Sequence, residues 1–441
     1  MSVQEAVLAA KQRLAQMRRV NLPPLARAGR VSQVIGLLIE TDGPDLQIGD
    51  LCELGTGVLA QCVGFREGRM LLMPFDEVEG MAPGARAVAL GRRLLAPCGQ
   101  SLLGRVIDGL GRVIDGGPAL QPEELRPTDR AALAPMARAP IEQPLPVGVR
   151  AIDGCLSCGR GQRLGLFAGS GVGKSTLLGM LARGTAADVN VIALVGERGR
   201  EVGEFLRDDL GEEGLRRSVV VVATSDQPAL ARIQAALTAT TIAEHFRDSG
   251  CQVLMLMDSL TRYAMAMREV GLARGEPPTS RGYTPSVFAA LPRLLERCGS
   301  SQVGGITGFY TVLVEGDDMN EPIADAARSI LDGHVVLSRA LAEVGQYPAI
   351  DILQSVSRLM PRLVDAEHLA AAQSLRTVLA THRQAADLID IGAYRAGTNP
   401  EIDRAVALID PVRAFLRQQT QDRSTWEQTR AALTAAVQEV A

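Results

Sequence analysis

Residues 164–176, with the sequence LGLFAGSGVGKST, encode a strand, a turn and a helix start in close succession. The apolar run 164–168 predicts a short buried strand. A glycine-rich loop follows it, and Lys174 and Ser175 then open a segment with apolar residues at helical spacing. A strand, a glycine loop and a helix that starts with Gly-Lys-Ser are typical of the P-loop, which binds phosphate groups. We therefore expect a nucleotide-binding domain built around this loop.

The loop suits a phosphate because its glycines let the backbone come close to the ligand. Gly169, Gly171 and Gly173 carry no Cβ, so backbone N–H groups can surround the phosphate oxygens. The helix N-terminus adds free donors and the positive end of its dipole. Lys174 supplies a positive charge to the β- and γ-phosphates, and Ser175 supplies a hydroxyl to Mg²⁺. The predicted nucleotide-binding residues of the loop are Gly169, Ser170, Gly171, Val172, Gly173, Lys174, Ser175 and Thr176.

One position departs from the full motif, because Ala168 stands where the pattern G-x-x-x-x-G-K-[ST] has its first glycine. That position ends the strand, where a small residue suffices. Only Lys11 and Lys174 are lysines among the 46 Lys and Arg residues, so the chain keeps a compact ammonium where a phosphate charge is needed. An accidental glycine turn is the alternative, and the agreement of strand, loop and helix argues against it.

Composition places the chain among globular proteins with more than one domain. Its 441 residues exceed one ordinary domain, so two or three domains are expected. A formal net charge of −4 argues against a general binder of polyanions. No run reaches the ~18 apolar residues of a membrane span. Residues 1–19 lack the apolar core of a signal peptide, so we expect a cytoplasmic protein.

Seven cysteines are scattered along the chain, and Cys155 and Cys158 form a C-x-x-C pair. A zinc site would need a second pair or two suitably spaced histidines, and the sequence has neither. Two small buried residues are therefore favoured over a redox or metal role.

Five segments differ in composition. Residues 1–30 predict a basic amphipathic arm that either packs on its own domain or docks on a partner or an anionic membrane surface. Short β-rich runs between turns predict a small β-barrel over 31–95. Residues 96–147 are expected to form a linker. Alternating strands and helices over 148–370 predict a parallel α/β domain, and 371–441 predict a helical C-terminal domain.

Particular runs carry these predictions. The expected barrel strands are 34–39, 58–63, 70–75 and 87–90. The expected strands of the α/β sheet are 164–168, 189–196, 218–223, 253–258 and 306–314. The sequence GRVIDG occurs at 104–109 and again at 111–116, which predicts a hairpin or a linker crossing to the next domain.

Two carboxylates follow predicted strands. Asp258 ends an apolar run, the Walker-B form in which an aspartate holds Mg²⁺, and open α/β sheets place ligands at such strand ends. Glu197 ends another apolar run, where a carboxylate can orient and polarise the water that attacks a γ-phosphate. Arg198 is a candidate phosphate contact. The alternatives are a helix-capping role for Asp258 and a surface charge cluster around Glu197.

Six motifs occur in an order that resembles one family. They are GLFAGSGVGKST, VGERGREVGEF, LMLMDSLTRYA, GEPPTSRGYTPSVF, SILDGHVVLSR and YPAIDILQSVSR. The set resembles the RecA-like rotary ATPase family of the ATP synthase α/β subunits. It is most similar to the type III secretion branch, the export ATPases of injectisomes and flagella. The resemblance covers nearly the whole chain and implies an α/β, RecA-like P-loop domain with a small N-terminal β-barrel and a C-terminal helical domain.

The resemblance also implies roles for single residues. Glu197 matches the glutamate that activates water, Lys174 and Ser175 the phosphate lysine and the Mg²⁺ hydroxyl, and Asp258 the Walker-B aspartate. Arg358 matches an arginine finger that acts on the neighbouring subunit's nucleotide, an effect of ~10³–10⁵ in rate where fingers have been tested.

Tyr347 matches the aromatic residue that stacks on adenine. By spacing alone, Tyr347 would be a half-buried core residue and Arg358 a surface salt bridge. Because one chain carries both the cradle and the finger, a homohexamer with like sites is implied.

The implied function is Mg²⁺-dependent ATP hydrolysis by a homohexameric ring that energises protein export at a type III secretion system, through substrate unfolding and chaperone release. The implied partners are stator or regulator proteins, central stalk proteins, export substrates and chaperones, on the cytoplasmic side of the inner-membrane export apparatus. Residues 151–158, 223–230 and 415–420 look more like injectisome members. Residues 69–75, 78–81 and 264–266, together with the basic arm, look more flagellar, and the injectisome is slightly preferred.

Three other functions stay open at this point: an RNA translocase, a subunit of an ion-translocating synthase and a non-catalytic scaffold. Residues 31–95 hold nine acidic and five basic side chains, with Phe65 and Phe75 as the aromatics. Nucleic-acid barrels use basic grooves with aromatic platforms, so no nucleic acid partner is expected. Glu197 argues against a scaffold.

Overall fold

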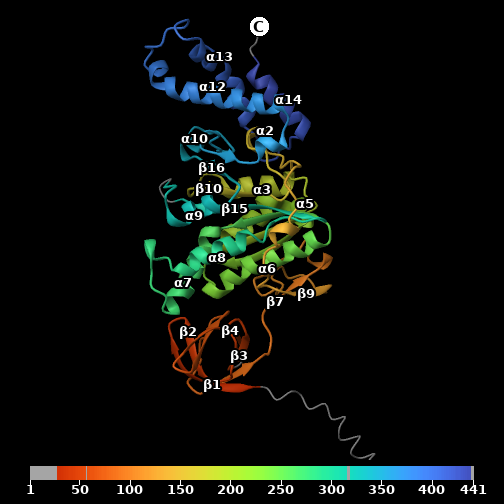
Figure 1. Ribbon diagram of the computed structural model, residues 1–441, viewed down its shortest axis with the longest axis vertical. Helices are drawn as coiled ribbons and strands as arrows, with labels where there is room; N and C mark the ends of the chain where they lie inside the picture. The colour runs from red at the N-terminus through yellow and green to blue at the C-terminus, as the bar shows by residue number, and fades with distance from the viewer. Residues whose placement is uncertain (1–26, 56, 315–317, 439–441) are drawn as a thin grey trace, which may run out of the picture. The chain divides into compact units, whose positions relative to one another are not determined.

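The computed structural model describes residues 27–55, 57–314 and 318–438. The amphipathic arm predicted over residues 1–30 therefore lies almost wholly outside the described residues. The chain forms two compact units, Met1–Arg93 and Leu94–Ala441 (Figure 1). Within the described ranges, no helix combines the length and the apolar character that a membrane crossing needs.

The first unit is a closed antiparallel barrel, as the sequence predicted, with strand order β1-β2-β5-β4-β3-β6. Alternate side chains point inward, and the buried ones include Ile39, Cys52 and Leu72. The strands are β1 (Ala28–Ile35), β2 (Leu38–Asp42), β3 (Leu51–Leu54), β4 (Val58–Arg66), β5 (Arg69–Pro74) and β6 (Arg86–Ala89).

One barrel prediction was wrong. The apolar run 34–39 was expected to be one strand, but a turn at residues 36–37 divides it between β1 and β2. Gly36 adopts a φ of 56°, which glycine reaches without strain, so the hairpin turns there although its flanks are apolar.

The second unit is built on a nine-stranded sheet of order β17-β16-β10-β15-β13-β11-β12-β8, with β14 paired to β15. Only β14 and β17 pair antiparallel. All five expected strands are present, and β16 was missed because a glycine and a histidine open its short apolar run. The strands are β8 (Val106–Asp108), β10 (Arg163–Ala168), β11 (Val189–Glu197), β12 (Ser218–Thr224), β13 (Gln252–Asp258), β14 (Gly299–Ser300), β15 (Gly305–Leu313), β16 (Gly333–Leu337) and β17 (Val356–Ser357).

Helices cover both faces of this sheet (Figure 1). Leu254 and Leu256 of β13 share one core with Leu178 and Leu181 of α3, and α6 contacts β11, β12 and β13. The helices are α2 (Arg150–Cys155), α3 (Lys174–Gly184), α4 (Gly199–Glu204), α5 (Gly211–Arg216), α6 (Ala229–Asp248), α7 (Leu260–Ala273), α8 (Pro285–Leu295), α9 (Pro322–Ile330), α10 (Arg339–Glu343) and α11 (Met360–Leu363). A π-helical turn spans Phe205–Leu210, and 3₁₀ turns span Gln100–Leu102, Pro135–Ala137 and Ser280–Gly282.

The repeated GRVIDG sequence forms a hairpin, as predicted, and its first copy also supplies β8 to the edge of the main sheet. Arg105 of the first copy makes a bidentate ion pair with Asp115 of the second, with N–O distances of 2.8 and 2.9 Å. Nearby, β7 (Leu95–Cys98) pairs with β9 (Glu124–Pro127) in a separate two-stranded ribbon.

Three long helices form the C-terminal region, which confirms the helical prediction. They are α12 (Ala366–Asp390), α13 (Pro400–Leu416) and α14 (Trp426–Val437). Side chains of Asp365, Asn399 and Thr425 cap their first turns. The helices contact one another and α2, so this region continues the core of the second unit.

Candidate nucleotide site

The P-loop joins β10 to α3 as the sequence predicted. Gly171 and Gly173 have φ values of 78° and 89°, a region that favours glycine. A Cβ on Gly171 would meet no atom within 4 Å, because this position faces open space. The loop borders a cavity of about 570 Å³. Of the predicted loop residues, those lining it are Gly169, Ser170, Gly171, Gly173, Lys174, Ser175 and Thr176, whereas Val172 is buried.

The structure brings the three predicted charged residues together at the strand ends. The Lys174 ammonium Nζ lies 2.5 Å from Oδ1 of Asp258 and 3.2 Å from Oε1 of Glu197. Glu197 ends β11, and Asp258 ends the neighbouring strand β13. The sheet therefore places both carboxylates beside the phosphate loop.

Burial and neighbouring charges affect the pKa values of Glu197 and Lys174 in different ways. Burial, and then the negative charge of Asp258, raise the pKa of Glu197 to about 7, although Lys174 opposes the shift. Burial lowers the pKa of Lys174, but the two carboxylates raise it by more, so the pKa of this ammonium lies above its ordinary value. The lysine therefore stays charged, whereas Glu197 can exchange a proton near neutral pH, as a group that handles water must.

Thr311 is a residue that the sequence did not single out. Its hydroxyl donates a 2.7 Å hydrogen bond to Oδ1 of Asp258 from the neighbouring strand β15. Asp258 is only 3 % exposed, so this bond orients a buried carboxylate. No motif predicts it, because strand pairing alone makes the two residues neighbours.

Three arginines line the same cavity, and one of them, Arg339 at the start of α10, donates to the carbonyl oxygen of Ser170 at 3.5 Å. Arg198, predicted as a phosphate contact, is largely exposed, and its guanidinium Nη1 lies 3.5 Å from Oε1 of Glu201. Arg262, on the first turn of α7, was missed by the sequence reasoning. Its side chain packs against the backbone of Gly196, and its Nε is buried with no hydrogen-bond partner among the described residues. Its place on the helix that follows Asp258 is the signal that could have found it.

The residues of the site suit Mg²⁺ bound together with a phosphate. Ser175 lines the cavity beside Lys174, and Lys174 contacts the Asp258 carboxylate. Mg²⁺ usually binds through one or two carboxylates plus substrate phosphates. In the described ranges, no group of three or more His, Cys, Asp or Glu side chains could hold a metal ion.

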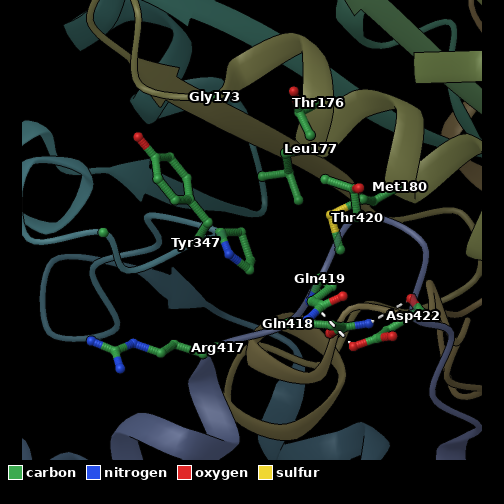
Figure 2. Close-up of a pocket in the computed structure, with 12 residues that line it drawn as sticks. Gly173, Thr176, Leu177, Met180, Tyr347, Arg417, Gln418, Gln419, Thr420 and Asp422 are labelled. Carbon is green, nitrogen blue, oxygen red and sulfur yellow. Dashed lines mark hydrogen bonds between the residues drawn. The ribbon is translucent and has the colours of Figure 1, made fainter. Parts of the chain in front are cut away.

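A second cavity, of about 730 Å³, shares Gly173 and Thr176 with the first. Figure 2 shows the residues that line this second cavity. Tyr347 borders it, with ring carbons 3.6 Å from the position that a Cβ on Gly173 would take. Tyr347 is 47 % exposed, so its ring is open to a ligand. Thr420 and neighbouring residues of the C-terminal region close the other side, which the sequence reasoning had not linked to the site.

Arg358 is the predicted residue that does not reach this site. It follows β17, where Ser357 lies opposite Gly333, the first residue of β16. The P-loop follows the C-terminal end of the adjacent strand β10, whereas Arg358 lies near the N-terminal end of that strand. The length of a six-residue strand, about 17 Å, therefore separates Arg358 from the P-loop of its own chain. Arg358 is exposed and donates to the carbonyl oxygen of Arg328 at 3.2 Å.

The Cys155–Cys158 pair is buried, as predicted. Burial raises the pKa of the Cys155 thiol to about 12 and that of Cys158 well above its usual value. Both thiols therefore stay protonated.

Comparisons with known proteins agree with this architecture. The ATP synthase alpha/beta family nucleotide-binding domain matches residues 148–357, its beta-barrel domain matches 31–91, and the T3SS EscN ATPase C-terminal domain matches 364–435.

Individual relatives are similar over most of the chain. The flagellum-specific ATP synthase of Bacillus subtilis is 55 % identical over 93 % of this chain and 95 % of its own. The type 3 secretion system ATPase of Xanthomonas euvesicatoria is 51 % identical over 93 % and 94 %. The assembled ATPase EscN in complex with its central stalk EscO, from enteropathogenic E. coli, gives a TM-score of 0.88 at 47 % identity and covers 93 % of this chain and 100 % of that one. The chain therefore belongs to the ATP synthase alpha/beta family, as an ATPase of the branch that holds the flagellum-specific ATP synthases and the type 3 secretion system ATPases.

Proposed function

We propose that this chain hydrolyses MgATP as a homohexameric ring and thereby energises protein export at a type III secretion machine. One observation carries the proposal: Lys174, Glu197 and Asp258 meet beside a phosphate loop, while Arg358 of the same chain lies at the opposite end of the sheet. A complete site therefore needs two copies of the chain.

Each residue has a defined task in hydrolysis. Residues 169–176 surround the triphosphate with backbone N–H groups, and Lys174 neutralises charge on its β- and γ-phosphates. Glu197 accepts a hydrogen bond from the attacking water and orients it toward the γ-phosphate. Arg198 and Arg262 face the same cavity and stabilise the negative charge on the transferring oxygens.

Ser175 and Asp258 would hold the Mg²⁺ ion, the serine directly and the aspartate through water. When bound, the ion neutralises developing charge on the phosphate oxygens. Thr311 keeps the Asp258 carboxylate oriented for this role.

The adenine base fits the second cavity, where Tyr347 offers an exposed ring face next to Gly173 (Figure 2). Because Gly173 and Thr176 border both cavities, one nucleotide spans them with its phosphates in the first. Aromatic stacking holds a base at little conformational cost.

Arg358 serves as an arginine finger for the neighbouring subunit. Its distance from the P-loop of its own chain supports an action in trans. A closed ring of identical subunits gives every site one cradle and one finger. The assembly of EscN, a similar protein, is consistent with such a ring.

The proposed partners are the central stalk, the stator or regulator proteins, export substrates and their chaperones. In this proposal the chain works in the cytoplasm, peripherally associated with the inner-membrane export apparatus, and the basic sequence of residues 1–30 contacts an anionic membrane surface. The structural relative bound to its central stalk supports the first partner.

The finer question is whether the chain serves flagellar export or an injectisome. Sequence details favour the injectisome slightly, whereas the 55 % identity to a flagellum-specific relative favours flagellar export. Deletion of the gene decides: loss of flagellar filaments supports the flagellar role, and loss of effector secretion from motile cells supports the injectisome.

An RNA translocase is the more distant alternative, and the barrel argues against it. Of the barrel aromatics, Phe75 is 1 % exposed and only Phe65 is open to solvent. A stacking platform for nucleic acid needs several exposed aromatic rings. A rotary synthase subunit, the other alternative, would copurify with a membrane rotor and support proton-driven ATP synthesis.

The decisive experiment compares the wild type with Glu197→Gln. The wild type should hydrolyse ATP only with Mg²⁺. The variant should bind a fluorescent ATP analogue as tightly but turn over roughly 10²–10⁴-fold more slowly. Equal turnover in both proteins would remove Glu197 from the mechanism, and no nucleotide binding by the wild type would overturn the proposal.

A further inference from the structure

The segment 417–422, between α13 and α14, forms one wall of the second cavity. Within it Gln418 is only 5 % exposed, whereas Arg417, Gln419 and Thr420 on either side are exposed. An amide in a buried position requires hydrogen-bond partners, since its desolvation is otherwise uncompensated.

Gln418 uses both ends of its amide. Its Oε1 accepts a 2.8 Å hydrogen bond from the backbone N–H of Arg150. Its Nε2 donates to the carbonyl oxygens of Gly148 at 2.8 Å and of Asp422 at 3.0 Å. Both amide hydrogens are therefore engaged, so the side chain has no donor left for a nucleotide.

The backbone of Gln418 contributes a further contact, because its N–H donates to the carbonyl oxygen of Tyr347 at 2.9 Å. One residue thus ties three segments that lie far apart in the sequence: the entry to α2, the turn that carries Tyr347, and the wall segment 417–422. Figure 2 shows Tyr347 on one side of the cavity and Gln418 with Asp422 on another.

The wall segment is also anchored to the P-loop helix. Arg183 on the last turn of α3 donates to the carbonyl oxygen of Thr420 at 2.6 Å. The cavity walls are thus joined through α3 on one side and through Gln418 on the other, and the exposed Gln419 between these anchors lines the cavity.

We propose that Gln418 is a positioning residue for the nucleobase: it holds the Tyr347 turn and the wall segment at the spacing that accepts a purine. This inference rests on the proposed function, in which the base occupies this cavity. Gln418 acts through Tyr347 and residues 419–420, so it governs affinity for the base and leaves the phosphate cradle and the chemical step alone.

The test measures two ligands on the full-length protein. Calorimetry gives the affinity for MgADP, and separately for Mg²⁺-tripolyphosphate, which lacks a base. Gln418→Ala should weaken MgADP binding and raise the KM for ATP about tenfold, because it removes the side-chain hydrogen bonds with Arg150, Gly148 and Asp422 that keep the backbone N–H of residue 418 in place against Tyr347. The kcat and the tripolyphosphate affinity should stay close to those of the wild type. Gln418→Glu keeps an acceptor for the Arg150 N–H but sets a carboxylate against the carbonyl oxygens of Gly148 and Asp422, so it should weaken MgADP binding at least as much as Gln418→Ala.

Gln421→Ala is the matched control, because Gln421 is exposed in the same segment and does not line the cavity. Equal loss of MgADP and tripolyphosphate binding, or an unchanged KM in both Gln418 variants, would overturn the inference while the wild-type ATPase activity still upheld the proposed function. If Gln418→Ala fails to fold, the same two affinities of Gln418→Glu decide. A wild type that binds tripolyphosphate but no ADP would overturn the base site itself.

Discussion

The ammonium of Lys174 lies 2.5 Å from the Asp258 carboxylate and compensates a second carboxylate, Glu197, at 3.2 Å. All three side chains are largely buried. A buried charge without a partner is strongly destabilising, whereas a compensated cluster is tolerated. The lysine that we propose for the phosphates therefore also neutralises the carboxylates next to it.

Replacement of this lysine should reveal both tasks. In Lys174→Ala, two carboxylates remain side by side without a cation, so we expect the free energy of unfolding to fall by about 3 kcal/mol and ATP hydrolysis to fall at least about 100-fold. Denaturant unfolding and a phosphate-release assay measure the two effects.

The double variant Lys174→Ala, Glu197→Gln separates them, because it removes one of the two negative charges. Compared with Lys174→Ala above pH 7, where Glu197 loses its proton, it should recover part of the lost stability and none of the activity. If the double variant were as unstable as Lys174→Ala alone, repulsion between the carboxylates would not be the cause of the lost stability.

The residues at the centre of the site could be predicted because each lies in a short local pattern. An apolar strand followed by glycines, or by one carboxylate, places Lys174, Glu197 and Asp258 at strand ends, and parallel strands end at the same edge of a sheet. The order of strands in the sheet does not change that result. Apolar runs of strand length likewise predicted five strands of the main sheet.

The supporting residues could not be predicted, because only tertiary contacts bring them to the site. Thr311 meets Asp258 across a strand pair, and Gln418 meets Tyr347 although 71 positions separate them along the chain. Arg262 carries no local signal besides its place on a helix that follows Asp258. The glycine turn at residue 36 was missed because its apolar neighbours obscure it.

A trans finger predicts complementation between inactive variants. Arg358→Ala should bind ATP normally and hydrolyse it ~10³-fold more slowly. Mixed with Lys174→Ala, it should regain activity, because some interfaces then combine an intact cradle with an intact finger. Steady-state ATPase assays across a range of mixing ratios measure the recovery.

The control is a mixture of Lys174→Ala with Glu197→Gln. Both changes lie in the cradle, so every interface keeps one defect and activity should stay low. Recovery in this mixture, or none in the mixture with Arg358→Ala, would contradict an action of Arg358 on the neighbouring subunit.

The Thr311 hydroxyl should matter for Mg²⁺ rather than for the fold. Thr311→Val keeps the shape but removes the 2.7 Å hydrogen bond to Asp258. Because groups that orient a metal ligand typically change metal affinity 10–100-fold, half-maximal ATPase activity should need roughly tenfold more Mg²⁺. Titration of activity with Mg²⁺ at saturating ATP measures this, and Thr311→Ser, which keeps the hydroxyl, should behave as the wild type. Identical Mg²⁺ curves for the valine variant would remove the orienting role.

The ion pair between the two GRVIDG copies should make stability depend on acid. Arg105 holds the pKa of Asp115 well below its ordinary value, and backbone N–H groups of Val106 and Gly117 lower the pKa further. A carboxyl with a depressed folded-state pKa stabilises the fold above its unfolded pKa of about 3.9, and this contribution is lost as the pH falls toward the folded value. Asp115→Asn should therefore be less stable than the wild type at pH 7, by about 1 kcal/mol since solvent screens a pair near the surface.

This difference should shrink as the pH falls from 7 to 3, because the Asp115 carboxyl of the unfolded wild type then takes up a proton, which favours unfolding and has no counterpart in the asparagine variant. Thermal unfolding midpoints, followed by circular dichroism at several pH values, report it as the gap between the two proteins. Asp410→Asn, which alters an exposed aspartate in α13, is the control for the loss of one negative charge without that pair. A constant gap for Asp115→Asn from pH 7 to 3 would mean that the asparagine weakens the hairpin by changing its packing, since a lost ion pair must titrate with the carboxyl that made it.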